Sequence, residues 1–374
     1  MIYLDYSANT PVDARVLEQF CAVERRCIGN ANSHHQAGSA AKAEIDAATI
    51  KIASLLGVQP AEIIYTSGAS EANNFALKGL ARLSRHAGRH IISTPLEHSS
   101  VSGTLTALQE QGYEIDLLDV KQDGTVDLEH LKDLLRPDTI CVAITLVDSE
   151  LGVVQPVQEI AAILKAYPHC HLHVDATQAV GKIPVSFEGV DTMSLTAHKF
   201  YGLNGIGLLI KRRNLALEPP IPGGASTTIY RSGTPTVALA CPLALALDKA
   251  MTGLSERVER VRGLNARLRT ELANGPKERI HRPEAGVPQN LNLSVKDVKG
   301  TVFQRELDAR GVCVSVKSAC SSDGLPSRAV FAVSHDRRNA LSSWRISLSH
   351  RTTDEEITGF LQAFDACYRT LTQP

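Results

Sequence analysis

Short apolar runs alternate with longer segments of helical periodicity over the first half of the chain. The runs predict β-strands, and the amphipathic or alanine-rich segments between them predict helices. Expected strands are 62–66, 90–94, 114–118, 139–145 and 171–175, and expected helices are 13–26, 39–56, 99–111 and 128–135. Strands this apolar are typical of a mostly parallel sheet covered by helices on both faces. Ligands of such sheets bind beyond the carboxyl ends of the strands, so the chemistry is expected there.

The pattern changes in the second half of the chain. Expected elements are an apolar helix at 235–251, a long arginine-containing helix at 254–274, a strand at 290–295, a helix at 301–309, a strand at 313–316 and a closing helix at 353–370. This mixture predicts a smaller α+β domain. We therefore expect a large domain at 12–255 and a small domain made of 1–11 and 256–374.

Composition and charge narrow the range of functions. The 374 residues include 39 basic and 40 acidic side chains, so no bulk attraction to nucleic acid or to a membrane surface is expected. The sequence contains no run of about 18 apolar residues and no secretory leader, which favours a cytoplasmic protein without a membrane partner. The eight cysteines show neither Cys-x-x-Cys pairs nor zinc-like Cys/His spacing, so we expect reduced thiols and no metal site.

A lysine lies at the centre of the expected chemistry. Lys199 follows small and hydroxyl-bearing residues in the stretch 194–202, and Asp175 ends the strand-like run before it. This pair suits pyridoxal 5′-phosphate, because the amine would hold the cofactor aldehyde as a Schiff base while the carboxylate keeps the pyridine nitrogen protonated. An ordinary solvent-facing lysine beside the loop residue His198 is the alternative interpretation.

A turn of small residues at 66–74 runs directly into a helix. Backbone N–H groups at a helix N-terminus are unsatisfied, and small side chains let a phosphate approach them closely. A capping box that starts at Ser67 or Ser70 is the alternative, and the two interpretations are compatible. Further polar residues, His98 and Ser149, follow other expected strands.

These residues belong to motifs that resemble one enzyme family. In chain order the motifs are Tyr3–Pro11, Thr66–Asn74, Glu97-His98, Glu150–Pro156, His173–Gln178, His198-Lys199 and Arg231–Thr234. They resemble the NifS/IscS-type cysteine desulfurases, pyridoxal-phosphate enzymes of the class V aminotransferase fold, in the right order over nearly the whole chain. The resemblance implies an α/β protein with fold type I of the PLP-dependent transferases, in which the large domain has a mostly parallel seven-stranded sheet.

The resemblance also implies a role for each matching residue. Lys199 would be the Schiff-base lysine, Asp175 the partner of the pyridine nitrogen and Gln178 a donor to the phenolic oxygen of the ring. His98 would stack on the ring and shuttle protons. Further positions implied to bind the cofactor, mostly its phosphate, are Ala69, Ser70, Ser149, Thr196 and His198. Thr234 would reach the phosphate of a partner subunit, which implies a homodimer with shared sites.

The small domain is expected to supply a nucleophile and a substrate clamp. Cys320 lies in the loop 317–327 among small, polar and glycine residues, where a thiol is accessible. By resemblance its thiolate would attack the sulfur of bound cysteine, keep it as a persulfide and release alanine; a free loop cysteine is the alternative. Arg345 matches the position that binds the substrate carboxylate, which a planar guanidinium suits. Asn30 is the second expected substrate contact.

Three segments depart from the family pattern in their residues, and the segment around Gly223-Gly224 is short. Asp148-Ser149 replaces a usual pair of asparagines, Ala197 replaces a common glycine, and Leu348-Ser349-His350 replaces the usual Leu-Gly-Arg. These changes leave the core chemistry in place and bear on rate and substrate preference.

The sequence as a whole predicts a cysteine desulfurase. It would convert L-cysteine to L-alanine and pass persulfide sulfur from Cys320 to an acceptor protein, in iron–sulfur assembly or in tRNA or DNA sulfuration. A selenocysteine lyase or another PLP-dependent β-lyase is the first alternative. A non-catalytic homologue that binds partners is the second.

Overall fold

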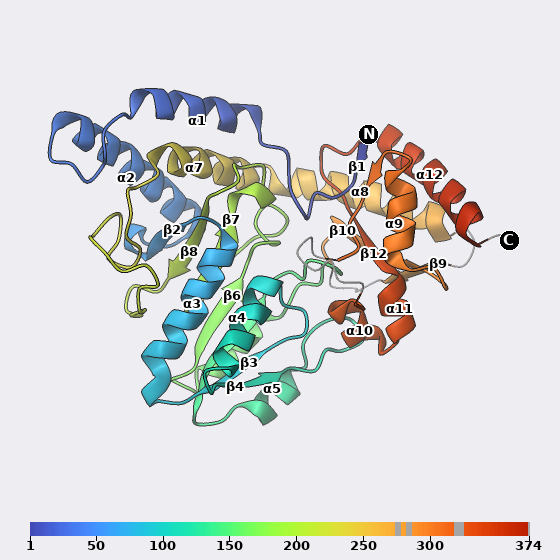
Figure 1. Ribbon diagram of the computed structural model, residues 1–374, viewed down its shortest axis with the longest axis horizontal. Helices are drawn as coiled ribbons and strands as arrows, with labels where there is room; N and C mark the ends of the chain where they lie inside the picture. The colour runs from blue at the N-terminus through green and yellow to red at the C-terminus, as the bar shows by residue number, and fades with distance from the viewer. Residues whose placement is uncertain (274–277, 282–285, 318–324, 373–374) are drawn as a thin grey trace.

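The chain folds into a large lobe and a small lobe (Figure 1). The computed structural model describes residues 1–273, 278–281, 286–317 and 325–372. Both termini lie in the small lobe, so the chain starts there, builds the large lobe and returns through one long helix.

A seven-stranded sheet forms the centre of the large lobe. Its strands are β2 (Ile63–Thr66), β3 (His90–Ser93), β4 (Glu114–Leu117), β5 (Thr139–Thr145), β6 (His171–Asp175), β7 (Thr192–Thr196) and β8 (Gly207–Lys211). Their order across the sheet is β2-β8-β7-β6-β5-β3-β4, and β8 points in the opposite direction to the other six strands. The connection from β7 to β8 contains no α-helix, so the chain returns directly and reverses its direction. Every strand except the edge strand β4 is buried almost throughout, which explains the continuous apolar runs.

Helices cover both faces of this sheet. They are α1 (Ala14–Arg26), α2 (Gln36–Leu56), α3 (Ala69–Leu83), α4 (Ser99–Gln109), α5 (Leu128–Leu134), α6 (Val157–Leu164) and α7 (Val237–Met251). On one face α2 and α7 pack together over a core that includes Ile63, and on the other α3 and α4 pack over a core that includes Ile64. Consecutive strand residues point to opposite faces, so one apolar run supplies both cores.

The small lobe has its own sheet and core. Its elements are β1 (Ile2–Tyr3), α8 (Leu254–Ala273), β9 (Glu278–His281), β10 (Asn290–Val295), α9 (Gly300–Asp308), β11 (Val312–Cys313), α10 (Arg328–Ser334), α11 (Arg337–Ser342), β12 (Ser343–Ser347) and α12 (Asp354–Thr372). Strand β10 pairs antiparallel with β12 and β9. Aromatic rings fill the core, where Phe303 stacks on Trp344 with their centroids 5.1 Å apart. Leu4 joins this core and β1 pairs with β11, so the first residues pack as part of the small lobe.

The predicted fold class, an α/β protein with a mostly parallel seven-stranded sheet and a smaller α+β lobe, is confirmed. The strand expected at 313–316 is shorter than predicted. Only Val312–Cys313 pairs with β1, because Ser315 instead forms an isolated bridge to Arg345. The domain boundaries after residues 11 and 255 stay a prediction. No single described helix is long and apolar enough to cross a membrane; α7 and α8 reach that length only as a pair bent by 64°.

Candidate active site

One cavity opens at the carboxyl ends of the parallel strands, where the two lobes meet. Ten residues predicted from the sequence line it: Ala69, Ser70, His98, Ser149, Asp175, Gln178, Thr196, His198, Lys199 and Arg345. All but Arg345, which lies on β12, come from the large lobe. The motifs meet because parallel strands end at the same edge of a sheet.

The start of α3 forms one end of the cavity. Gly68 is the N-cap residue, with a φ of 153°, and Ala69 and Ser70 follow it in the first turn. A Cβ atom on Gly207 would lie 2.6 Å from the Leu195 carbonyl oxygen and 2.7 Å from the Gly68 Cα atom, so glycine is required where β8 passes this turn. The exposed N–H groups of a helix start, next to a small turn, suit a phosphate group.

Thr196 and His198 lie beside this helix start. The Thr196 Oγ1 atom donates to the Ile206 carbonyl oxygen at 3.1 Å and lies 3.1 Å from His198 Nδ1. Burial, together with the charge of Lys199, lowers the pKa of His198 to about 4. The imidazole is therefore neutral at physiological pH, and it acts here as a hydrogen-bonding group rather than as a cation.

Asp175 ends β6, and its carboxylate is held from two sides. Oδ2 accepts a hydrogen bond of 2.8 Å from Asn73 Nδ2, and Oδ1 accepts one of 2.9 Å from the Thr177 N–H. The fully buried Asn73 is itself fixed, because its Oδ1 accepts from Ser194 Oγ and lies 3.0 Å from His173 Nε2. The carboxylate thus enters the cavity in one orientation.

Asn73 also connects this carboxylate to His98. Its Nδ2 donates to Ser100 Oγ at 2.9 Å, and Ser100 Oγ lies 2.9 Å from His98 Nδ1. The Ser100 backbone N–H donates to the same Nδ1 atom at 3.1 Å. A ring nitrogen that accepts hydrogen bonds carries no proton, so the neutral imidazole holds its proton on Nε2. Burial lowers the pKa of His98, against the opposing effect of Asp175, and favours this neutral form.

Lys199 ends the short 3-10 turn Ala197–Lys199 that follows β7. Its Nζ donates to the carbonyl oxygens of Ser7 at 2.8 Å and Ala8 at 2.7 Å, both in the N-terminal segment. Gln178 Nε2 donates to the same Ser7 oxygen at 2.8 Å. The amine and the amide predicted to touch the cofactor therefore converge on one point of the cavity wall.

A second lysine supports Gln178. The buried Lys182 donates from Nζ to Gln178 Oε1 and, at 3.3 Å, to Ser7 Oγ. With Oε1 engaged, Gln178 presents its Nε2 as a donor. Burial, with the charges of Lys199 and Arg345, lowers the pKa of Lys182 well below its usual value. Sequence reasoning missed Lys182, which lies with Gln178 in the turn that follows β6 and matches no motif.

Arg345 is 1% exposed and is held by partners far away in the sequence. Nη2 donates to Asp5 Oδ1 at 2.8 Å and Nη1 to the Ser149 carbonyl oxygen at 2.6 Å. Ser315 Oγ donates to the second Asp5 oxygen at 2.7 Å. Arg345 Nε is buried and has no partner among the described residues, which leaves an N–H donor for a ligand carboxylate.

Buried carboxyl groups lie next to this site. Burial raises the pKa of Glu97 to about 8, and that of Asp148 to about 7, with a further contribution from Glu150. Asp148 Oδ2 accepts hydrogen bonds from the backbone N–H groups of residues 150 and 151, so this departure from the family pattern closes a local turn. Burial also raises the pKa of Glu150, whose Oε2 accepts from Ser327 Oγ of the small lobe.

Three predicted residues are not placed in this cavity. Cys320 lies outside the described residues. Asn30 is exposed between α1 and α2, where its Oδ1 accepts from the Asn32 N–H at 2.9 Å. Thr234 is exposed between β8 and α7. Neither Asn30 nor Thr234 lines the cavity of a single chain, so their roles and the homodimer stay predictions.

The residues present fit pyridoxal phosphate. Asp175 offers a fixed carboxylate to a pyridine nitrogen, Lys199 an amine to an aldehyde, and the start of α3 a cradle for a phosphate. Thr177 Oγ1 is a further buried hydroxyl on the cavity wall, with no partner among the described residues. When bound, the cofactor supplies an electron-withdrawing ring that stabilises negative charge on a substrate carbon.

The class of protein follows from this fold and these residues. The aminotransferase class-V family matches residues 2–360, and the chain belongs to that family. Class-V aminotransferases and the cysteine desulfurases among them depend on pyridoxal phosphate, which confirms the cofactor predicted from Lys199 and Asp175.

Particular relatives narrow the class. Cysteine desulfurase IscS of Cronobacter sakazakii is 39% identical over 369 residues, covering 95% of this chain and 90% of that protein. A solved structure described as a NifS-like protein superimposes with a TM-score of 0.93 at 35% identity, over 99% of this chain and 100% of that one. The structure of SspA in complex with cysteine gives a TM-score of 0.83 at 28% identity, over 94% and 100%. The resemblance to the NifS/IscS-type proteins is confirmed.

Proposed function

We propose that this chain is a cysteine desulfurase, which removes sulfur from L-cysteine, releases L-alanine and passes the sulfur to an acceptor protein. The proposal is carried by the presence of Lys199, Asp175 and Arg345 in one cavity of a class-V fold. The first two residues suit the cofactor, and the third suits the α-carboxylate of an amino acid. Relatives named as cysteine desulfurases, and the likeness to SspA with bound cysteine, support cysteine as that amino acid.

Each side chain of the cavity has a task in this proposal. Arg345 binds the α-carboxylate and sets one orientation of the substrate over the ring. Lys199 Nζ removes and returns the proton of the α-carbon, and His98, neutral with its proton on Nε2, moves a second proton. Asp175 would hold its negative charge against the pyridine nitrogen of the bound cofactor, and Gln178 would donate to the phenolic oxygen.

The sulfur step is assigned to Cys320. Its thiolate attacks the sulfur of bound cysteine, so that an S–S bond forms while the C–S bond breaks and leaves its electron pair on the substrate carbon. Protonation of that carbon gives alanine, and the persulfide goes to the acceptor. We further infer that Asn30 contacts the substrate and that Thr234 reaches the phosphate site of a second subunit in a homodimer. The cytoplasmic location stays a prediction.

Turnover of L-cysteine by the cofactor-loaded protein tests this proposal. Alanine and sulfide are measured in the presence of a thiol reductant for wild type, Lys199→Ala, Cys320→Ala and the matched control Cys21→Ala, which changes an exposed cysteine of α1. We expect the control to match wild type, and the other two variants to lose at least ~10³-fold in rate. A wild type that binds cofactor but forms no alanine from cysteine refutes the proposal.

The same set of variants separates the alternatives. A selenocysteine lyase or another β-lyase would retain its activity in Cys320→Ala, because such a reaction needs no protein thiol. A non-catalytic homologue would show no visible absorbance even after incubation with the cofactor.

A further inference from the structure

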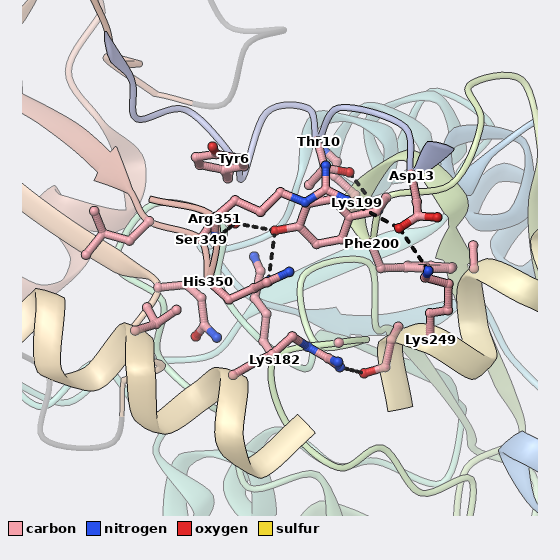
Figure 2. Close-up of a pocket in the computed structure, with 18 of the residues that line it drawn as sticks. Tyr6, Thr10, Asp13, Lys182, Lys199, Phe200, Lys249, Ser349, His350 and Arg351 are labelled. Atoms are coloured by element: carbon pink, nitrogen blue, oxygen red, sulfur yellow. Dashed lines mark hydrogen bonds and ion pairs between the residues drawn. The ribbon is translucent and has the colours of Figure 1, made fainter. Parts of the chain in front are cut away.

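A second cavity lies between the two lobes and shares Lys199 with the cofactor cavity (Figure 2). Its wall comes from the N-terminal segment, the turn that contains Lys199, helices α7 and α8, and the turn 348–351 that follows β12. Arg345 is the only described residue of β12 that lines the cofactor cavity. The turn 348–351 lines the second cavity and follows β12 directly, so a few residues of chain connect the two cavities. None of the steps assigned above uses this second space.

The wall of this cavity carries an excess of positive charge. Besides Lys182 and Lys199, whose amines serve the cofactor site, it includes Lys249, Arg257 and Arg351, and its carboxylate is Asp13. Asp13 Oδ2 lies 3.0 Å from Lys249 Nζ and 3.4 Å from Arg351 Nη2, so one carboxylate serves two cations.

Arg257 has no such counter-charge. The half-buried guanidinium donates to the backbone carbonyl oxygens of Thr252 and Ala250 at the end of α7, and it forms no ion pair with any residue that the structure describes. Burial lowers the pKa of Arg257, against the opposing effects of Tyr201 and Glu256. A bound anion would supply the missing counter-charge.

Neutral polar groups complete the wall. The Tyr201 hydroxyl contacts Ser349 Oγ and lies 3.4 Å from His350 Nδ1, while the Arg351 guanidinium lies 4.5 Å from the centre of the Tyr201 ring. Tyr201 has a φ of 67°, a left-handed conformation that is unfavourable for a tyrosine, and its N–H donates to Thr10 Oγ1 at 2.7 Å. Figure 2 shows Arg351, Ser349 and His350 gathered on the same side of the space as Tyr6.

We propose that this second cavity binds a small oxyanion, a phosphate or a carboxylate, between Arg257 of α8 and Arg351 of the turn after β12. The hydroxyl of Tyr201 and the side chains of Ser349 and His350 are its neutral partners. Such an anion ties α8 and the 348–351 turn to the turn that bears Lys199. None of the five residues named for this anion site is assigned a step on cysteine, although Lys199, which is assigned one, lines the same cavity.

Titration of the cofactor-loaded protein with inorganic phosphate, and separately with succinate, tests this site. Loading with pyridoxal phosphate matters, because it fills the phosphate cradle at the start of α3. By calorimetry at constant ionic strength we expect saturable binding of at least one anion, weakened at least about tenfold in Arg257→Met and in Arg351→Met. The matched control is Arg267→Met, which changes an arginine of α8 that pairs with Asp354 at the surface.

The imidazole of His350 provides a second measurement. Burial and the charges of Arg257, Arg351 and Arg260 lower the pKa of His350 to about 4. A bound anion opposes the charge of these arginines and so raises the pKa of His350. NMR detects this change as a shift in the pH titration of the His350 resonance. That resonance is identified by its absence from the spectrum of His350→Gln.

Two results overturn the proposal. One is the absence of saturable phosphate and succinate binding to the loaded protein. The other is unchanged affinity in both arginine variants, which would place the anion elsewhere. Arg257 caps α7, so Arg257→Met could fail to fold. In that case the affinity of Arg351→Met alone tests the proposal, because Arg351 lies at the exposed edge of the cavity.

Discussion

The two halves of the cofactor cavity are held in different ways. In the large-lobe half, Asp175 is fixed by Asn73, and Asn73 is fixed by Ser194 and His173. These residues lie on α3, β6 and β7, so every contact stays within one sheet and the helix that covers it. Folding of the large lobe is sufficient to orient the carboxylate.

The small-lobe half is held by segments that lie farther apart in the chain. Arg345 is held by Asp5 and by the Ser149 carbonyl oxygen, which lie 340 and 196 positions away in the chain. These contacts exist only when the N-terminal segment, β12 and the turn after β5 have all met. The comparison teaches that the Asp175 carboxylate is oriented by contacts within the large lobe alone, whereas Arg345 is oriented both by the N-terminal segment and by Ser149 of the other lobe.

The largest effect on catalysis is expected from a substitution in the large-lobe half of the cavity. Asp175→Asn removes the negative charge opposite the pyridine nitrogen, and we expect kcat to fall by roughly 10²–10³-fold. The visible absorbance of the bound cofactor should change as well, because the ring nitrogen loses its counter-charge. Steady-state kinetics and absorbance spectra measure both, with Asp119→Asn at an exposed site as the control. An unchanged kcat would contradict the role given to Asp175.

A smaller and different effect is expected from the small-lobe half. Arg345→Met removes the carboxylate clamp, so KM for cysteine should rise by about 10–100-fold, while the cofactor absorbance stays as in wild type. Arg345→Lys should recover only part of the loss, since an ammonium lacks the planar fork of donors. Loss of cofactor binding in Arg345→Met would show that the two halves are not separate.

Asp5→Asn sharpens the same comparison. The amide oxygen can still accept from Arg345, but an NH2 group replaces the oxygen that accepts from Ser315, and the side chain carries no charge, so Arg345 is held less firmly. We expect KM to rise about 3–10-fold, with kcat nearly unchanged. Kinetics of this variant beside Asp46→Asn, an exposed aspartate of α2, give the measurement. An effect on kcat larger than that on KM would contradict a positioning role for Asp5.

The smallest effect concerns the stability of the large-lobe half. Glu97 Oε1 accepts from the Thr145 N–H and Thr94 Oγ1, and burial raises its pKa from 4.5 to about 8 in the folded chain. The folded state therefore retains a proton that the unfolded chain loses, so the stability that Glu97 contributes is complete below about pH 4.5 and is lost as the pH rises through about 8.

Glu97→Gln cannot lose a proton, so its stability relative to wild type should increase over that pH range. We expect a relative gain of at least about 1 kcal/mol in the free energy of unfolding, measured by urea titration at both ends of the range. If the free energy of unfolding changed with pH by the same amount in both proteins, Glu97 would not keep its proton in the folded chain.

Much of the large lobe was readable from the sequence. Strand ends predicted a shared site for His98, Ser149 and Asp175, and the family resemblance added Gln178, Thr196 and Lys199; the structure brings these six residues into one cavity. Asn73 stood in a recognised motif but received no role, since its partners on β6 and β7 are defined by packing across the sheet. Asn30, Thr234 and Cys320 remain predictions.

What the sequence by itself determined were most elements of the first half of the chain, their order, the family and several residues that follow strands, because strand burial, helix capping and turn chemistry are set by residues close together in the chain. Only the tertiary structure decided that Asp5 holds Arg345, that Lys182 orients Gln178, and that cations from both lobes surround a second cavity. A local periodicity in the sequence cannot predict the contact between Asp5 and Arg345, which are 340 positions apart, because this contact forms only when distant segments pack together.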